Sequence, residues 1–371
     1  MNPTYDFLIV GAGVFGAVFA REMTDFGKKC LVIDKFNHIA GHCYTEEQEG
    51  IQVHKYGPHI FHTDEPELWQ YVQKFCPFTP YCHRGKVNYR DKIYSFPINL
   101  MTLNQLWGVK TPEEARRCLE AKKIPCESPQ NLEEWALSQV GEEIYNIFIK
   151  GYTTKQWGRD PKELLPFVIK RLPIRLSFND TYYTDRFQGI PEGGYTRLFT
   201  NLLNGIEVRL NQDYFDQKKE WDRLARNVVF TGRIDEFFDY QHGELEYRSL
   251  RFENKILPIP DFQGTAVMNY TDEKVPYTRI TEYKHFEMKD LNHTIISTEY
   301  PDTWNRNKTP YYPVNTNVNN AIYEKYYQET LQLSHMIFGG RLAEFKYMDM
   351  HNVIASALTK ANEWKSKYEK K

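Results

Sequence analysis

Three glycines near the start of the chain are spaced as G-x-G-x-x-G, a pattern that can bind phosphate groups. Gly11, Gly13 and Gly16 follow an apolar run that we expect to be a buried strand. Gly11 permits a sharp turn, Gly13 removes the Cβ that would block a pyrophosphate, and Gly16 lets the next helix pack closely. That helix would point its unpaired N–H groups at the phosphates. We therefore predict a dinucleotide-binding turn that includes Val14 and Phe15.

An acidic residue at the end of the next apolar run supports the same interpretation. Asp34 follows residues 29–33, which read as a second buried strand. A carboxylate there can accept a hydrogen bond from a ribose 2′-hydroxyl, which favours a dinucleotide without a 2′-phosphate. A small-residue turn and an expected hairpin over residues 45–54 follow, where an NAD dehydrogenase more often continues with another βαβ repeat. The arrangement therefore favours FAD over NAD.

Two histidines follow a glycine–proline turn within residues 55–63 and are candidates for a flavin site. A flavin ring needs a flat or polar group against one face, and His59 is suited to that role. The alternative is a buried histidine whose hydrogen bonds are satisfied within the protein. His59 and His62 have no acidic or cysteine ligands in a matching pattern, so we expect no metal site.

Aromatic and cationic residues further along the chain have the chemistry of a nucleotide site. Trp157 and Tyr152 lie near a glycine-bounded turn, where Trp157 can stack on a base or fill a core. Arg171 and Arg279 lie close to prolines, and two converging arginines would clamp a diphosphate, whereas either arginine alone is an ordinary surface ion pair. The sequence contains no G-x-S-x-G pattern. We therefore expect the protein to lend binding groups to a cofactor that carries out the reaction.

Composition limits the class of protein. The chain has 371 residues with 47 basic and 49 acidic side chains, so we expect two or three substructures and neither nucleic acid nor an anionic membrane as a partner. The sequence shows no basic and apolar leader and no run of about 18 apolar residues. Its six cysteines include no C-x-x-C pair. We expect a soluble cytoplasmic protein with reduced thiols.

The elements that must position these residues fall into three groups. Residues 99–170 are predicted to be helical, with N-caps at Thr111 and Asn131. Residues 171–190 and 240–300 are rich in Tyr, Phe, Thr and Val and predict an antiparallel sheet. The remaining helices and strands are expected to rejoin the dinucleotide-binding part, and they are residues 194–203, 206–210, 227–232, 337–341 and 350–364.

Seven motifs, in order along essentially the whole chain, resemble those of bacterial UDP-galactopyranose mutases. They are GPHIFHT at 57–63, GYTTKQW at 151–157, RLPIR at 171–175, VPYTR at 275–279, YYPV at 311–314, GGRL at 339–342 and YMDM at 347–350. The resemblance is specific, because other FAD proteins share only the glycine pattern. It implies an α/β fold in which an FAD-binding Rossmann-like domain carries an inserted helical bundle and a six-stranded antiparallel sheet, usually as a homodimer.

The domain boundaries that we expect are discontinuous. They are residues 1–82, 191–239 and 325–371 for the FAD domain, 98–170 for the helical bundle, and 83–97, 171–190 and 240–324 for the sheet domain. One departure from the family falls in the FAD domain, where Ala40-Gly41-His42 stands in place of the common Gly-Gly-Asn. We expect the Cβ of Ala40 to require a negative φ.

The resemblance also implies roles for individual residues. Trp157 would stack on uracil with Tyr152 nearby, and Arg171 and Arg279 would hold the diphosphate. Residues that would line the phosphate and sugar region are Tyr182, Tyr312, Tyr347 and Asp349. Residues implied near the flavin are His59, His62 and Arg341, and the further FAD contacts would be Gly11, Gly13, Val14, Phe15, Gly16, Asp34, Lys35, Gly41, His42 and Asp349.

The implied reaction interconverts UDP-galactopyranose and UDP-galactofuranose, a precursor of cell-surface polysaccharide, without net redox change. N5 of reduced FAD attacks the anomeric carbon, UDP leaves, the adduct opens as an iminium, and the sugar recloses through its 4-hydroxyl. NAD(P)H or a flavin reductant would activate the enzyme. Two alternatives remain open: an FAD oxidoreductase of the amine-oxidase or desaturase type, and a flavoprotein that binds a nucleotide sugar without catalysis.

Overall fold

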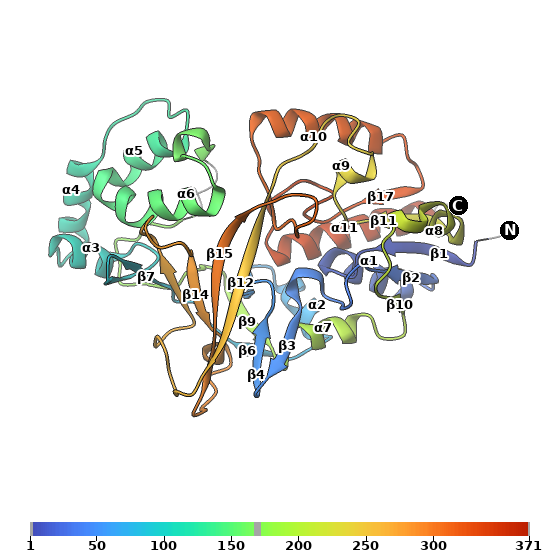
Figure 1. The fold of residues 1–371 in the computed structure, drawn as a ribbon, viewed down its shortest axis with the longest axis horizontal. Coiled ribbons are helices and arrows are strands. Elements are labelled where there is room, and N and C mark those ends of the chain that lie inside the picture. Colours follow the sequence, from blue (N-terminus) through green and yellow to red (C-terminus); the bar gives the residue numbers. More distant parts are fainter. Residues whose placement is uncertain (1–2, 167–171, 370–371) are drawn as a thin grey trace. The chain divides into compact units, whose positions relative to one another are not determined.

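The computed structural model describes residues 3–166 and 172–369, and the chain divides into two compact units. The first unit comprises Met1–Pro80, Asp185–Tyr247 and Pro310–Lys371, and the second comprises Tyr81–Thr184 and Arg248–Thr309. Each unit is therefore assembled from stretches that lie far apart in the sequence, as the colours of Figure 1 show. The expected division into three domains stays a prediction.

A parallel sheet forms the centre of the first unit. Its strand order is β10-β2-β1-β11-β17, and every neighbouring pair is parallel. The returns of residues 227–232 and 337–341 to this sheet are confirmed. The strands span Tyr5–Val10 (β1), Cys30–Ile33 (β2), Glu207–Arg209 (β10), Ala225–Phe230 (β11) and Met336–Phe338 (β17).

Helices cover both faces of this sheet, which explains why its central strand is a continuous apolar run. Phe7 and Ile9 of β1 pack in the core formed with α1 and α11, whereas Leu8 packs in the opposite core with Trp221 of α8. Figure 1 shows α1 and α11 side by side against the strands. These helices span Val14–Asp25 (α1), Lys218–Leu224 (α8) and Met350–Glu369 (α11).

Smaller elements complete the first unit. The expected hairpin over residues 45–54 is confirmed as β3 and β4, and a separate small sheet has the order β5-β9-β6. The strands span Thr45–Gln48 (β3), Ile51–His54 (β4), Phe61–Thr63 (β5), Phe78–Pro80 (β6), Phe187–Pro191 (β9) and Tyr312–Pro313 (β16), and the helices Pro66–Gln73 (α2), Gly194–Leu202 (α7), Ile234–Phe237 (α9) and Asn317–Thr330 (α10).

The expectation that residues 171–190 form strands of the large antiparallel sheet is wrong for the part that the structure describes. Residues 172–186 contain no strand, and β9 belongs to the small sheet of the first unit. The backbone of the earlier part makes single bonds in place of a ladder: Arg175 N donates to Ile98 O at 2.9 Å, and Tyr182 N donates to His83 O at 2.7 Å. Its aromatic composition reflects contacts with other residues of the second unit, such as Tyr182 with His83.

Six strands of the second unit form one sheet in the order β12-β15-β14-β13-β7-β8. Neighbouring strands are antiparallel except β13 and β7, which are parallel, so the expected antiparallel sheet contains one parallel pair. No tight turn joins these two strands, because β7 lies far from β13 in the sequence. The strands span Lys86–Tyr89 (β7), Lys92–Ser95 (β8), Tyr247–Leu257 (β12), Val267–Tyr270 (β13), Arg279–Glu282 (β14) and Thr294–Thr303 (β15).

The expected helices of the second unit are confirmed, and local capping explains where they begin. Oγ1 of Thr111 accepts a hydrogen bond from Glu114 N at 3.2 Å, and Oδ1 of Asn131 accepts one from Glu134 N at 3.0 Å. The helices are α3 (Leu100–Trp107), α4 (Pro112–Lys122), α5 (Leu132–Ile144) and α6 (Gly151–Trp157), with a π-helical stretch over Tyr145–Lys150. They pack around a shared apolar core with the β7–β8 hairpin.

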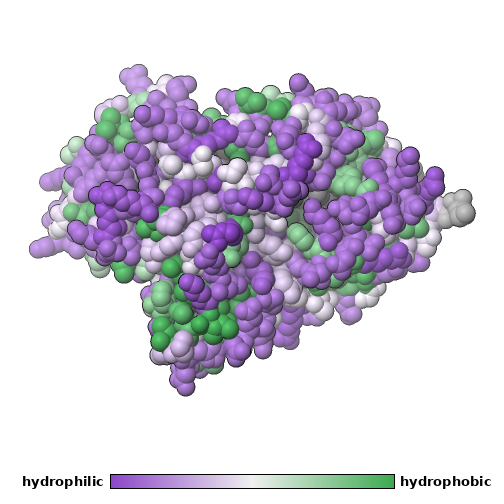
Figure 2. All heavy atoms as spheres, viewed as in Figure 1, coloured by the Kyte–Doolittle hydropathy of each residue, from purple (hydrophilic) through white to green (hydrophobic). Residues whose placement is uncertain are grey.

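Several apolar side chains of the second unit are exposed, among them Ile256, Phe262 and Met288. Figure 2 shows a hydrophobic area on the surface of this unit, in the region where its long strands end in Figure 1. Among the described residues, no helix has the length and hydropathy needed to cross a membrane.

Candidate dinucleotide and substrate site

The three glycines of the turn between β1 and α1 differ in whether the protein's own packing leaves space for a Cβ. Gly11 has φ +110°, and a Cβ there would lie 2.0 Å from Oγ1 of Thr231. A Cβ on Gly16 would lie 2.0 Å from Gly11 O. Gly13, by contrast, has φ −79°, and a Cβ there would meet only the Cα of Gly41 at 3.9 Å. The absence of a side chain at Gly13 therefore suits a bound pyrophosphate rather than internal packing.

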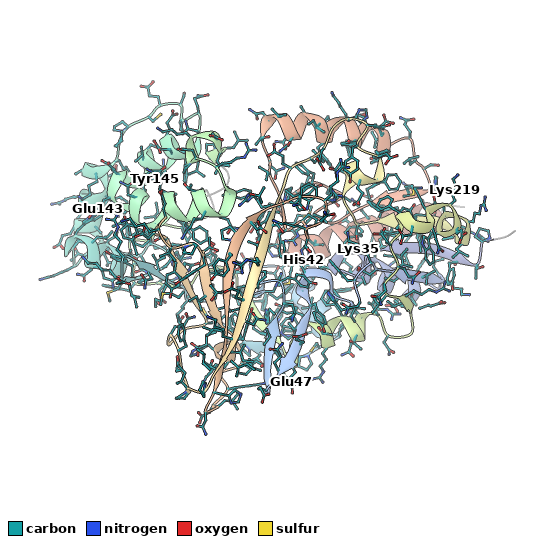
Figure 3. All side chains as sticks on the ribbon, in the orientation of Figure 1. Lys35, His42, Glu47, Glu143, Tyr145 and Lys219 are labelled. Atoms are coloured by element: carbon teal, nitrogen blue, oxygen red, sulfur yellow. The ribbon has the colours of Figure 1, made fainter. Side chains whose placement is uncertain are left out.

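Asp34 lies at the end of β2 and is held by two backbone donors. Its Oδ2 accepts a hydrogen bond from Ala12 N at 2.7 Å, and its Oδ1 accepts one from Phe36 N at 2.9 Å. Burial raises the pKa of this carboxyl, and the two N–H groups oppose that shift. Each oxygen has a further lone pair, so the carboxylate can also accept from a ribose hydroxyl. The next residue, Lys35, is labelled with His42 in Figure 3.

Ala40 corrects an expectation, because its φ is +73°. A left-handed conformation costs a residue with a Cβ about 1–2 kcal/mol. Tertiary contacts hold it there: Ala40 N donates to Ala12 O at 2.9 Å, which ties this turn to the glycine turn, and Ala40 is completely buried. Gly41 follows, and a Cβ there would lie 3.1 Å from the Cα of Gly13. The two turns thus form a cradle in which the backbones approach closely at Gly13 and Gly41 and leave little room for side chains.

His42 and Arg341 form a pair within the first unit. Nη2 of Arg341 donates to Nδ1 of His42 at 2.9 Å, which requires that nitrogen to be unprotonated. Burial and the charge of Arg341 hold the pKa of His42 well below its usual value. The His42 ring stacks on Tyr311 with centroids 4.8 Å apart. This pair places a fixed cation and a neutral imidazole close to the cradle.

The two predicted histidines have different surroundings. Nδ1 of His59 lies 2.7 Å from Gly57 O, and His59 N donates to Nδ1 of buried His54 at 3.0 Å. His62 lies in β5, where its Nδ1 is 3.0 Å from Oδ2 of Asp185. Burial lowers the pKa of His62, although Asp185 and Asp349 oppose the shift. The ring of each histidine therefore lies within hydrogen-bonding distance of another group in the first unit.

Two tyrosines and an aspartate of the predicted sugar region also belong to the first unit. The rings of Tyr312 and Tyr347 stack with centroids 5.5 Å apart and an interplanar angle of 22°. Asp349 lies directly before α11, and its carbonyl accepts from Val353 N at 3.1 Å. The ring of Tyr312 therefore lies against Tyr347, two residues before Asp349 and the N-terminal end of α11. This part of the first unit carries two phenol groups and one carboxylate next to the positive end of a helix.

Helix α6 of the second unit carries Tyr152 and Trp157. Trp157 is half-buried and packs against the apolar core of the helices, as does Tyr182. The end of α6 is fixed by Arg248, whose Nε donates to Gln156 O at 3.0 Å. Gly158 ends the helix with φ +63°. Trp157 therefore combines a packed edge with partial exposure, which fits a base-stacking residue as well as a core residue.

Arg279 is held by a buried carboxylate that the sequence analysis missed. Its Nε and Nη2 lie 2.7 and 2.6 Å from Oε2 of Glu299, which is 1% exposed. Arg279 and Glu299 are direct partners in the β14–β15 ladder. The other Glu299 oxygen accepts from Oγ1 of Thr278 at 3.0 Å. A signal for Glu299 was present, since a glutamate in the apolar run of β15 needs a charged partner.

His83 is the second residue that the sequence analysis missed. Its ring lies 5.3 Å from that of Tyr182, and its carbonyl accepts from Tyr182 N. Burial and the charge of Arg279 lower the pKa of His83 to about 3, so it is neutral at ordinary pH. The second unit thus brings together Arg279, Glu299, His83 and Tyr182, while Arg171 lies outside the described residues.

The parallel sheet, the glycine turn and Asp34 define a dinucleotide-binding protein of the Rossmann type, and residues 9–75 match the model of the NAD(P)-binding Rossmann-like domain. Residues 147–347 match the model of UDP-galactopyranose mutase. The chain belongs to the UDP-galactopyranose mutase family, and it is an isomerase with FAD as its cofactor. The fold class and the isomerase activity expected from the resemblance are thereby confirmed.

Relatives cover nearly the whole chain. The protein is 42% identical to dTDP-fucopyranose mutase of Escherichia coli (95% of this chain, 96% of that protein) and 39% identical to a probable UDP-galactopyranose mutase of Klebsiella pneumoniae (97% and 94%). A crystal structure of reduced UDP-galactopyranose mutase superposes with a TM-score of 0.77 at 15% identity, covering 98% of this chain and 94% of that one. A putative protoporphyrinogen oxidase from Exiguobacterium shares the fold, with a TM-score of 0.69 at 13% identity (99% and 100%).

Proposed function

We propose that this protein interconverts UDP-galactopyranose and UDP-galactofuranose. The observation that carries the proposal is the ion pair in which buried Glu299 holds the guanidinium of Arg279. Arg279 belongs to the same unit as Trp157. An arginine fixed in this way keeps its remaining N–H groups in a set orientation, as is needed to hold a diphosphate leaving group.

The chain's own residues fit FAD. Gly13 and Gly41 leave a cradle free of side chains, Asp34 offers acceptors to a ribose, and Arg341 supplies a fixed positive charge. When bound and reduced, FAD supplies a nucleophilic nitrogen that displaces UDP from the anomeric carbon.

The groups proposed to bind the substrate stack on its base, neutralise its diphosphate and orient its sugar. Trp157 stacks on the pyrimidine with Tyr152 beside it, and Arg279, together with Arg171, neutralises the charge of the departing diphosphate. Hydroxyl and carboxylate groups that orient the phosphates and sugar are supplied by Tyr182, Tyr312, Tyr347 and Asp349. Nδ1 of His62 lies 3.0 Å from Oδ2 of Asp185, and the neutral tautomer that donates to this carboxylate has Nε2 as its proton-accepting nitrogen.

A second candidate substrate is dTDP-fucopyranose. The 42% identity to dTDP-fucopyranose mutase over 95% of the chain favours it. Thymine adds one methyl group to uracil, and fucose lacks the 6-hydroxyl of galactose, so the same ring contraction applies to both sugars.

The test is to incubate the dithionite-reduced protein with each furanose nucleotide in turn and to separate the products by chromatography. We expect the pyranose of the preferred nucleotide to form only after reduction, without stoichiometric use of an electron acceptor. Stoichiometric acceptor use would identify an oxidoreductase, and tight binding without turnover would identify a nucleotide-sugar carrier.

Three further features belong to this proposal. We expect a homodimer, and the exposed apolar side chains Ile256, Phe262 and Met288 support self-association. We expect NAD(P)H or a flavin reductant to activate the enzyme, and a cytoplasmic location is consistent with six free cysteines. Light scattering of the purified protein tests the first, and anaerobic bleaching of its flavin absorbance by NAD(P)H tests the second.

A further inference from the structure

The ammonium group of Lys155 lies inside a cage of four backbone carbonyls. Its Nζ is 2.8 Å from Tyr270 O, 2.9 Å from Asp272 O, 3.0 Å from Val275 O and 2.9 Å from Tyr277 O. A lysine ammonium has three protons and no acceptor, and here four carbonyl oxygens surround it. The cage is therefore a built binding site for a compact cation, filled by the protein's own side chain.

The cage joins two elements that the proposed reaction uses. Lys155 comes from α6, which carries Trp157, and all four carbonyls come from the segment that runs from the end of β13 to two residues before Arg279. Residues 271–278 connect β13 and β14 and form the β13–β14 loop. The hydrogen bonds of Nζ therefore connect α6, which carries Trp157, to β14, which begins with Arg279.

A second contact shows that α6 and the β13–β14 loop are packed at close range. A Cβ on Gly151, the first residue of α6, would lie 2.2 Å from Thr271 O and 2.9 Å from Cγ of Glu273. Both Gly151 and Lys155 thus face the same loop, four residues apart on one side of the helix. The loop contains no helix or strand. Lys155 supplies a donor to Tyr270 O, Val275 O and Tyr277 O, whereas Asp272 O also accepts a hydrogen bond from Val275 N at 3.2 Å within the loop.

The charge of Lys155 is maintained at a cost. Burial lowers the pKa of the Lys155 ammonium to about 8, and the nearby carboxylates of Asp272 and Glu273 oppose that shift. A group placed in such surroundings only to fill space would be better served by an apolar side chain.

We propose that Lys155 is a positioning residue, whose caged ammonium fixes the spacing between Trp157 and Arg279. That spacing sets the distance between the pyrimidine and the diphosphate of a nucleotide that the enzyme can bind. The inference rests on the proposed function, in which these two side chains bind the two ends of the nucleotide. Lys155 contacts neither the cofactor nor the reacting atoms in this account, so its loss alters nucleotide affinity more than the chemical step.

The experiment compares wild type, Lys155→Ala and Lys155→Arg as FAD-loaded full-length proteins. The control is Lys274→Ala, because Lys274 lies in the same loop but is exposed. The dissociation constants of UDP and dTDP, the KM and kcat of the reduced enzyme, and the flavin content are measured for each. For Lys155→Ala we expect Kd and KM to rise at least tenfold, kcat to change less than threefold, and flavin content to stay at the wild-type level. Lys274→Ala should match wild type.

Chemical rescue separates positioning by the ammonium from a general loss of structure. Lys155→Ala removes the ammonium donor from all four carbonyls, and Asp272 O keeps its bond from Val275 N. Ammonium or methylammonium chloride should bring the Kd back to within threefold of wild type, whereas sodium chloride at equal ionic strength should not. Lys155→Arg keeps the charge, but its planar fork does not suit four converging carbonyls, so its Kd should also rise at least tenfold.

An unchanged Kd in Lys155→Ala, or a raised Kd that ammonium does not lower, would overturn the proposal. If Lys155→Ala does not fold, Lys155→Arg decides, and wild-type nucleotide affinity in that variant overturns it equally. Failure of the proposed function has a different signature, since wild type would then neither bind UDP or dTDP nor convert the nucleotide sugars.

Discussion

At the scale of single residues, Trp157 is the side chain whose role a binding measurement decides most directly. Its ring is half-buried at the end of α6 and packs against the helical core. We expect Trp157→Ala to weaken UDP binding by about 1–3 kcal/mol, the contribution of one base–aromatic stack. Titration calorimetry on the FAD-loaded variant measures the change, and the flavin content should match wild type. Unchanged affinity together with a lowered melting temperature would assign Trp157 to the core.

Arg279 offers a comparison with an ordinary ion pair in the same unit. Arg279→Ala should lower kcat/KM at least about tenfold, or about 1.4 kcal/mol of transition-state stabilisation, because the proposed reaction uses the guanidinium to hold the leaving diphosphate. Arg279→Lys should recover only part of the rate, since lysine lacks the fork. The control is Arg84→Ala, because Arg84 is 58% exposed and pairs with Asp180 at 3.0 Å, and exposed pairs contribute about 0–1 kcal/mol.

The same steady-state assay applies to Arg171, for which the expectation rests on sequence alone. Arg171→Ala should also lose at least about tenfold in kcat/KM. Turnover close to wild type in both alanine variants, at substrate well below KM, would remove the two arginines from the diphosphate site.

At the scale of elements, the turn between β1 and α1 predicts opposite outcomes for two glycines. A Cβ on Gly13 has no atom closer than 3.9 Å, whereas a Cβ on Gly16 would lie 2.0 Å from Gly11 O. We expect Gly13→Ala to fold with a melting temperature near that of wild-type apoprotein but to purify with little FAD. Gly16→Ala should lose stability even without cofactor, because helix and strand must separate.

Absorbance at the flavin band and thermal unfolding of the apoproteins provide the two measurements. Full FAD occupancy in Gly13→Ala would show that this glycine does not face the pyrophosphate. Equal melting temperatures for the two variants would contradict the packing role assigned to Gly16.

At the scale of the whole molecule, each unit contains a buried histidine that resists protonation. His54 in the first unit and His83 in the second have pKa values lowered to about 3, chiefly by burial. The unfolded chain binds these protons near pH 6.5. Both histidines are neutral in both states above pH 6.5, so their contribution to stability is complete there and is lost as the pH falls from 6.5 towards 3.

We therefore expect the free energy of unfolding to fall below pH 6.5, by up to about 1.4 kcal/mol per pH unit for each histidine. Urea unfolding between pH 4 and 7 measures this slope. His54→Asn removes one titrating imidazole and should therefore reduce this slope by about one proton. The variant should still fold, because an amide oxygen can accept the hydrogen bond that His59 N now donates to Nδ1. His335→Asn, at an exposed position, is the control, and an equal slope in wild type and His54→Asn would refute the assignment.

Features that depend on neighbours within a few residues could be predicted from the sequence. The glycine turn, the acid after β2, the hairpin over residues 45–54 and the caps at Thr111 and Asn131 all follow from local spacing. Backbone dihedrals and capping bonds of this kind are settled by side chains close in the sequence. Together with the motifs, they sufficed to predict the family, the cofactor and the fold class.

The distant residues that support the site could not be predicted and become visible in the folded protein. Glu299 and Arg279 are 20 residues apart and meet because β14 and β15 are paired in one register. Lys155 is more than 100 residues from the carbonyls that surround it. The positive φ of Ala40 and the lack of strands in residues 172–186 also arise from distant contacts. A hydrogen bond between remote segments leaves no periodic pattern in the sequence, and its free energy depends on burial that exists only after the chain has folded.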